Sequence, residues 1–432
     1  MKRKTFIKSA ALTAAGSMVV PYILPSGRLF AATGSRKANH VVFCLFAGGV
    51  RNIESMQKAD GNLMTNTLNG NESISSDISG AMTSLPQLAS TRLQNQGTLY
   101  QQFSYANGPT GHFNGHTTAL TGKYTDTNIQ IQQPPQYPTI FEYYRKHNSP
   151  TMSALNAWWI CDQLGPYPYL NYSLYDGYGP NYGANMLQPG TIFSGPSYAE
   201  LGSPLSFSSS QQSKCDLIKT TMNGQFKAPT GVSAATGIQN TPEDQAHLQT
   251  FINTLMSNAA AGTYYNTWGV NMDNDMYNIL FGIQVLQEFK PELMVINMTG
   301  IDIGHFNFTQ YVDSIRKADY ALYKLWEAIQ STPGMAGDTV LIVAPEHGRN
   351  QQPNSEIDTY GRYGLDHTND NMSREIFCLI VGPSGVVKQG QVFTGPMGES
   401  VDIVPTIGNI LGFDGNMPLG MLDGTNLSEA FV

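Results

Sequence analysis

Charged side chains are scarce in this sequence of 432 residues. Asp, Glu, Lys and Arg make up 13% of it, about half of the usual share, and Asn, Gln, Ser, Thr, Gly and Tyr take their place. Such a polar, uncharged surface is typical of proteins that work outside the cytoplasm. The net charge is −8, which argues against a nucleic-acid-binding function because an acidic surface repels phosphates. Hydrophobic residues reach 41%, which excludes a disordered chain.

Cysteine is also rare, with four residues and no Cys-x-x-Cys pair, so a thiolate zinc site is not expected. Cys44 and Cys378 lie in apolar runs and are expected in the core. Cys161 and Cys215 lie in a polar region, where an oxidising compartment would allow them to pair, although spacing alone does not establish the pair. No solenoid repeat occurs. Beyond the N-terminus no apolar run is long enough to span a membrane.

The first 32 residues have the features of an export signal. Lysines and one arginine precede an apolar stretch at 10–24, and small residues follow it at Ala31 and Ala32. The segment from Arg3 to Lys8 resembles a twin-arginine signal in which lysine replaces the second arginine, so both the Tat and the Sec routes stay open. We expect residues 1–32 to be removed on export to the periplasm, the cell surface or the medium.

Short apolar runs predict the core of the fold, and they lie at 40–46, 293–298, 339–344 and 376–381. Runs of this kind suit strands that are buried on both faces of a parallel sheet. Residues 309–330 repeat apolar side chains at helical spacing, which predicts a strand–helix–strand crossover, and 405–411 predict a further short helix. Residues 33–432 are therefore expected to form one α/β domain with a mostly parallel central sheet flanked by helices.

A long segment at 158–262 interrupts this pattern. It is rich in Tyr, Pro, Gly, Ser and Asn, shows little periodicity, and predicts a helix only near 242–257. We interpret it as a loop-rich insertion that caps the sheet edge, with aromatic side chains that pack on one another. Alternatively, its tyrosines line a substrate cleft or contact a protein partner.

Five side chains of the kinds that bind metal ions follow or adjoin the predicted strands: Asp302, His305, Glu346, His347 and His367. Because ligand sites of parallel sheets lie at the carboxyl ends of the strands, we expect the five to converge. Imidazole nitrogens combined with carboxylate oxygens suit zinc, with Ca, Mg and Mn as alternatives. The sequence therefore predicts a divalent metal site at this edge.

A further segment, 108–122, carries glycines and threonines ahead of a short predicted helix. Backbone amides at a helix start, with Thr110 and His112 beside them, can bind an anion. The alternative is a helix cap with a surface pair of histidines, His112 and His116. The sequence favours neither interpretation.

The order of these motifs resembles the alkaline-phosphatase-like superfamily, which includes sulfatases, phosphodiesterases and phosphopentomutases. The motifs are Gly48-Gly49, Leu120-Thr121-Gly122, Asp302-Ile303-Gly304-His305, Glu346-His347-Gly348, His367 and Asp402-Ile403-Val404-Pro405-Thr406-Ile407. The chain resembles still more closely a poorly characterised branch of exported bacterial proteins. That branch has the motif Glu-Phe-Gly-Arg where this chain has Glu346-His347-Gly348-Arg349, and Gly-Arg-Asp-His where it has Gly364-Leu365-Asp366-His367. The resemblance covers 39–151 and 290–412 and leaves the insertion out.

The resemblance implies two metal positions and a nucleophile. The set that corresponds to the first metal position is complete: Asp302, His305 and His367. The second position retains Glu346 and His347, but Gly48 stands where the family has an aspartate. Candidates to replace that aspartate are Asn52, Glu54, His112 and His116. The nucleophile position falls on His112 in place of Ser, Thr or Cys, and the modifiable motif of sulfatases is absent.

Two hypotheses follow. The first is an exported, metal-dependent hydrolase of a phosphate or sulfate ester, whose substrate is a small anionic ester or a polysaccharide. Thr110, or a water molecule aided by His112, would attack, and Arg349 would pair with the anionic group. His112 would serve either as a ligand or as a general base. The alternative is a non-catalytic, metal-stabilised secreted protein for binding or surface assembly, which the residues at Gly48 and His112 favour.

Overall fold

The computed structural model describes residues 36–56, 63–68, 81–86, 88, 91–125, 134–148, 154–161, 170–189, 241–265, 267–368 and 370–432, and the backbone of 22–23 and 29–30. The predicted export signal lies almost entirely outside these residues. Cys161 is buried, and Cys215, with which it could pair in an oxidising compartment, lies outside the described residues. None of the helices in the described part is both long and apolar enough to cross a membrane.

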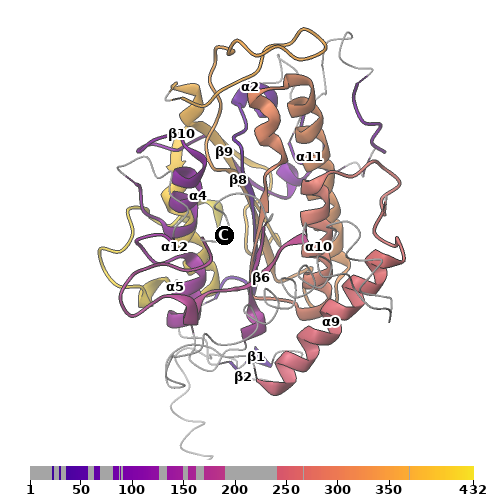
Figure 1. The fold of residues 1–432 in the computed structure, drawn as a ribbon. Coiled ribbons are helices and arrows are strands. Elements are labelled where there is room, and N and C mark those ends of the chain that lie inside the picture. The colour runs from indigo at the N-terminus through magenta and orange to yellow at the C-terminus, as the bar shows by residue number, and fades with distance from the viewer. Residues whose placement is uncertain are drawn as a thin grey trace, which may run out of the picture.

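An eight-stranded sheet forms the centre of the molecule (Figure 1), in the order β10–β4–β9–β8–β3–β7–β5–β6. Its strands are β3 (His40–Phe46), β4 (Gly97–Ser104), β5 (Ala157–Ile160), β6 (Asn185–Leu187), β7 (Leu293–Met298), β8 (Thr339–Pro345), β9 (Glu375–Val381) and β10 (Gln391–Glu399). Within this sheet β9 runs antiparallel to β8 and β4, and the other pairings are parallel. The predicted α/β fold with a mostly parallel sheet is confirmed. A separate short pair joins β1 (Tyr22–Ile23) to β2 (Leu29–Phe30).

Helices cover both faces of the sheet (Figure 1). One layer contains α9 (Pro242–Ala260), α10 (Asn274–Phe289) and α11 (Phe308–Ser331), and the other contains α4 (His112–Thr121), α5 (Ile140–His147) and α12 (Ile403–Leu411). A short helix α2 spans Asn52–Ser55. The 3₁₀ helices are η2 (Leu93–Gln96), η3 (Ala154–Asn156), η5 (Pro180–Tyr182), η6 (Gly300–His305), η7 (Met372–Arg374), η8 (Ser400–Asp402), η9 (Asp414–Asn416) and η10 (Ser428–Ala430).

The central strands are apolar throughout because each face packs on a helical layer. All seven residues of β3 are buried. Its alternate side chains enter different cores, with Cys44 on the side of α10 and α11 and Phe43 on the side of α4 and α12. The four predicted strands correspond to β3, β7, β8 and β9, and the predicted helices 309–330 and 405–411 lie within α11 and α12.

Part of the segment predicted as an insertion belongs to the sheet. β5 pairs with β7, and β6 pairs with β5 at the sheet edge. Trp158 and Trp159 are fully buried, one in each core. The helix predicted near 242–257 is present as part of α9. Residues 162–169 and 190–240 of the predicted cap lie outside the described residues, so the insertion's role stays a prediction.

The chain leaves β3 through a turn at Gly48 and Gly49, where three loops come close together. Both glycines have positive φ, +105° and +78°. A Cβ at Gly48 would lie 2.4 Å from the backbone nitrogen of Asp302, and one at Gly49 would lie 2.6 Å from the carbonyl oxygen of Gly348. Glycine is required here because the loops after β7 and β8 fill the space that side chains would need.

Gly48→Ala is expected to destabilise the protein more than Gly334→Ala. Both positions have positive φ, which costs a non-glycine residue ~1–3 kcal/mol. Only Gly48 adds a backbone clash, because no atom lies within 4 Å of a Cβ built at Gly334 (φ +87°). Urea unfolding of the two variants measures the difference, and equal losses of unfolding free energy would contradict the close approach of the loops.

Candidate metal centre

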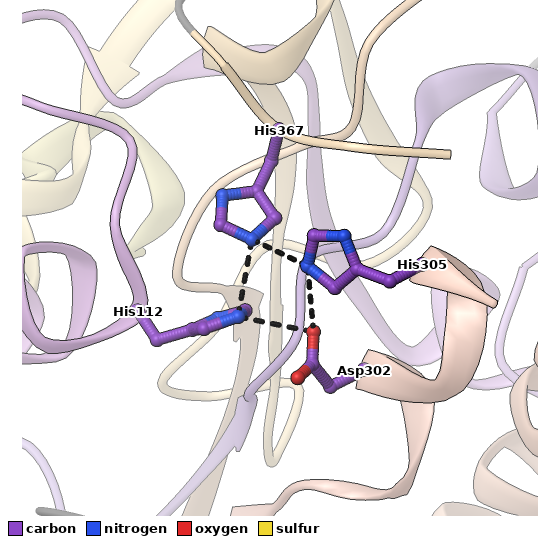
Figure 2. A group of neighbouring side chains, drawn as sticks. All are labelled: His112, Asp302, His305 and His367. Atoms are coloured by element: carbon purple, nitrogen blue, oxygen red, sulfur yellow. Dashed lines mark hydrogen bonds and ion pairs between the residues drawn. The ribbon is translucent and has the colours of Figure 1, made fainter. Parts of the chain in front are cut away.

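Four side chains from separate parts of the chain point toward one another (Figure 2). His112 is the first residue of α4, Asp302 and His305 lie in η6 directly after β7, and His367 lies in the loop between β8 and β9. One potential ligand atom from each lies within 4.8 Å of the others. The convergence predicted for Asp302, His305 and His367 is confirmed, and His112 joins them.

The four atoms are spaced like the ligands of one small cation. His305 Nε2 lies 2.9 Å from His367 Nε2, which lies 3.1 Å from His112 Nε2. Asp302 Oδ1 lies 3.0 Å from His112 Nε2 and 3.3 Å from His305 Nε2. Zinc bonds of ~2.0–2.1 Å would place tetrahedral ligands about 3.3–3.4 Å apart, so the cluster has nearly this size already.

Hydrogen bonds to the other ring nitrogens determine where the imidazole protons lie. Each of the three Nδ1 atoms faces an acceptor: Asp366 Oδ1 for His305, the backbone oxygen of Thr110 for His367, and Glu346 Oε1 for His112. A neutral imidazole carries one proton, so these partners assign it to Nδ1 and leave a lone pair on Nε2. Lone pairs 2.9 Å apart repel one another, and a cation between them removes the repulsion. The residues therefore fit a divalent metal ion.

The charges around His112 lead to the same conclusion. Burial lowers the pKa of His112, but the carboxylates of Glu346 and Asp302 outweigh this and raise that pKa to about 10. Burial, together with His347 and His112, lowers the pKa of His367 to about 2. Without a metal ion, His112 thus holds a proton between Asp302 and His367. Metal binding at this point would displace that proton.

A second group of possible ligands, His112, Glu346 and His347, adjoins the first. Glu346 and His347 directly follow β8 and are fully buried. Glu346 accepts a hydrogen bond from His112 Nδ1 at 2.7 Å and one from the amide of Gly48, and it contacts His116 Nδ1. The second metal position implied by the resemblance therefore contains its glutamate and histidine but no aspartate.

Of the four residues considered as substitutes for that aspartate, His112 belongs to this second group, and the other three have different partners. The Glu54 carboxylate binds the guanidinium of Arg51, at 2.9 Å from Nε, and Asn52 faces Glu375 at 3.4 Å. His116 is fully buried, with Nε2 2.8 Å from Asn297 Oδ1. The alternative of a surface pair formed by His112 and His116 is therefore wrong.

Arg349 lies behind the cluster and has no exposed surface. Its guanidinium donates to the carbonyl oxygens of Gly49 and Leu365 and, at 2.9 Å, to Asp302 Oδ1. The expectation that Arg349 pairs with a substrate anion does not fit this position, because its hydrogen-bond donors already have partners inside the protein. Its contact with Asp302 instead makes it a positioning residue for that carboxylate.

Arg349→Lys is expected to lower the free energy of unfolding by about 2–3 kcal/mol, because one ammonium group cannot satisfy both carbonyl groups and Asp302. Metal affinity should also fall, on the order of 10–100-fold, as Asp302 loses its fixed orientation. Urea unfolding and metal titration measure the two effects. The control is Lys324→Gln, which removes an exposed ion pair with Glu327 and should cost under ~1 kcal/mol. Equal effects of the two substitutions would contradict the assigned role.

The positions of Thr110 and His112 also do not suit the catalytic roles expected of them, in which Thr110 attacks the ester or His112 assists an attacking water molecule. The Thr110 side chain is buried and its hydroxyl donates to the backbone oxygen of His367, so its proton is already engaged within the protein. Both ring nitrogens of His112 are engaged, one with Glu346 and the other in the cluster. Of the two roles considered for His112, ligation fits this geometry better than general-base catalysis.

Sequence reasoning missed the residues that orient the ligands. Asp366 Oδ1 accepts from His305 Nδ1 at 2.8 Å and from Asn354 at 2.9 Å. Asn354 also donates to the backbone oxygen of His305. Asp366 directly precedes His367, so its place in the same motif was the available signal. Nothing in the sequence pointed to Asn354.

Comparisons with known proteins bear on the fold. No protein-family model matches the chain, and no curated protein matches it. A solved structure of a variant of alkaline phosphatase PafA is similar over 93% of this chain and 100% of its own, with a TM-score of 0.50 and 12% identity. This chain has an alkaline-phosphatase-like fold. The fold predicted from the order of the motifs is thus confirmed, while membership of the exported bacterial branch stays a prediction.

Other solved structures resemble the alkaline-phosphatase-like fold of this chain more weakly. A protein of the alkaline phosphatase superfamily from Vibrio parahaemolyticus is 11% identical, with 97% of this chain and 80% of that protein covered and a TM-score of 0.44. The phosphonate monoester hydrolase SpPMH from Silicibacter pomeroyi is 12% identical, with 90% and 76% covered and a TM-score of 0.45.

Proposed function

We propose that this chain is a metal-dependent hydrolase of an anionic ester, either a phosphate or a sulfate. The observation that supports the proposal is the cluster of three histidines and Asp302 beside the carboxyl end of β7, where parallel α/β proteins bind their ligands. The cluster is open on one side, since 41% of the Asp302 side chain and 23% of those of His112 and His305 are exposed. A substrate can reach it from the Asp302 side.

The residues of the chain hold the metal and fix its ligands. A divalent ion, with zinc as the first choice, supplies Lewis-acid activation of water and of the ester when it is bound. His112, His305 and His367 would bind it through Nε2, and Asp302 through Oδ1. Asp366 and Glu346 hold the rings of His305 and His112 in place, and such partners make an imidazole a better ligand.

A second candidate function is that of a non-catalytic, metal-stabilised binding or surface-assembly protein. Four protein ligands are the number typical of structural zinc sites, whereas catalytic sites keep a position open. His112 also stands where the resemblance places a nucleophile. In that case the ion would stabilise the junction of the start of α4 with the loops that follow β7 and β8, and the insertion would contact a protein partner.

Turnover at known metal content separates the two functions. The mature chain is assayed against aryl phosphates, aryl sulfates and phosphonate monoesters after its bound metal has been quantified. The hydrolase proposal expects turnover that Asp302→Ala removes and that Glu327→Ala, at an exposed carboxylate on α11, leaves unchanged. A parent chain that holds its ion and turns over none of these esters would favour the binding protein.

We further propose that the protein acts outside the cytoplasm. The support is the basic and then apolar N-terminal segment and the uncharged polar composition. N-terminal sequencing of the native protein should find a chain that begins near Ala32 or Thr33. An intact Met1 in a cytoplasmic fraction would contradict export.

A further inference from the structure

The second metal position implied by the resemblance lacks room for its missing carboxylate. Gly48 stands at that place, and a Cβ there would lie 2.4 Å from the nitrogen and 2.7 Å from the Cα of Asp302. An aspartate would collide with the residue that takes part in the first cluster. The second group is therefore limited to His112, Glu346 and His347.

Hydrogen-bond donors already surround the carboxylate of Glu346. Oε1 accepts from His112 Nδ1 at 2.7 Å and from the Gly48 amide. Oε2 has no hydrogen-bond partner, although His116 Nδ1 lies close to it as an ion-pair contact. Both Glu346 and His116 are fully buried. These N–H groups balance a buried negative charge, which is the task that a second cation would otherwise perform.

His112 would have to lose both ring protons to serve two ions. Its Nε2 faces the first cluster, 3.0 Å from Asp302 Oδ1, so only Nδ1 is left for a second ion. That nitrogen donates to Glu346, and a metal there would break this hydrogen bond and turn the ring into a doubly deprotonated bridge. Two atoms would gain from a second ion, because Glu346 Oε2 and His347 Nε2 are both buried without a hydrogen-bond partner. His347 Nε2 lies 3.4 Å from Glu346 Oε1. His347 is therefore the residue at which one-ion and two-ion arrangements differ.

We infer that the chain binds one metal ion, held by His112, Asp302, His305 and His367, and that N–H groups around Glu346 take the place of a second. This inference rests on the metal centre of the proposed function and specifies its chemistry. With one ion, an ester cannot be clamped between two metals on the attacking and leaving sides. Glu346 and His347, predicted as ligands, become residues that support His112.

Metal stoichiometry tests the inference. The mature chain is loaded with Zn²⁺, desalted, and examined by native mass spectrometry and elemental analysis beside His347→Gln and the matched variant His367→Gln. We expect one ion in the parent and one in His347→Gln, while His367→Gln loses affinity more than 100-fold. Two ions in the parent with one in His347→Gln, or no ion in the parent, would overturn the inference.

Two further measurements distinguish a change in metal binding from a failure of the variant to fold. Circular dichroism establishes that each variant is folded, and His347→Asn replaces His347→Gln if the longer side chain does not fit. The d–d absorption of bound Co²⁺ should be the same in the parent and in the His347 variant if one ion is bound. A protein that binds one ion but hydrolyses no ester would contradict the proposed hydrolase and agree with the one-ion inference. A protein that hydrolyses an ester with two bound ions would support the hydrolase and overturn the inference.

Discussion

His112→Ala is expected to reduce ester hydrolysis by about 1,000-fold or more, whereas Thr110→Ala should reduce it less than roughly tenfold. His112 contributes a ligand atom, and even residues that only orient ligands typically cost 10–100-fold in metal affinity or activity. The Thr110 hydroxyl donates a hydrogen bond to the backbone oxygen of His367, and such a bond is worth about 1 kcal/mol. Its backbone oxygen, which accepts from His367 Nδ1, is retained in the variant. Initial rates on the best aryl ester, with bound metal measured in each protein, provide the comparison.

The opposite pattern would identify a different attacking group. Activity that is lost in Thr110→Ala at full metal occupancy, but kept in His112→Ala, would show that the threonine hydroxyl turns toward the substrate. His112→Gln is the conservative control because it keeps a polar side chain of similar length. Partial recovery of metal binding in that variant would support ligation, since a general base would gain nothing from an amide.

Removal of the metal ion is expected to lower the free energy of unfolding by about 4 kcal/mol, compared with protein at a free ion concentration ~1,000 times Kd. The ion would join α4, η6 and the loop before β9, in addition to hydrogen bonds such as the one from the Leu365 amide to the carbonyl oxygen of Gly304. Without it, the lone pairs of His305 and His367 face each other at 2.9 Å. Urea unfolding with and without a chelator measures the change, and adding Zn²⁺ back should reverse it.

His367→Gln provides the matched control for this experiment. The stability of His367→Gln should depend on the chelator much less than that of the parent, because one of the four ligands is gone. Parent protein that unfolds at the same urea concentration with and without the chelator would contradict a metal centre at this place. An equal chelator effect in parent and variant would locate the bound metal elsewhere.

Burial on two faces is what made the central strands predictable. β3, β7, β8 and most of β9 are continuous apolar runs because both helical layers cover them. β10 lies at an edge, is mostly exposed or half-buried and contains two glycines and a proline, so its sequence carries no such signal. β5 has only four residues and begins where the composition turns to tyrosine and proline. An edge position thus hid β10, whereas β5, which is buried between β7 and β6, was hidden by its short length.

The metal ligands were predictable for a related reason, and their neighbours were not. Asp302 and His305 directly follow a buried strand, so the topology determines where they lie. The direction of a long side chain is not determined in this way. Arg349 also follows a strand, yet its guanidinium turns inward to two carbonyl groups and Asp302. The partner of His112 is 234 residues away in sequence, and no local pattern could pair them.

The turn at Gly48 has an evolutionary consequence. A mutation that restored an aspartate there would meet the backbone of η6, the element that carries Asp302 and His305. The reversal would need a simultaneous shift of that backbone, which would disturb the metal ligands before any new one could form. Replacing Gly48 by any residue with a Cβ is therefore unfavourable, and descendants of this chain should retain glycine at this position whichever reaction or partner they acquire.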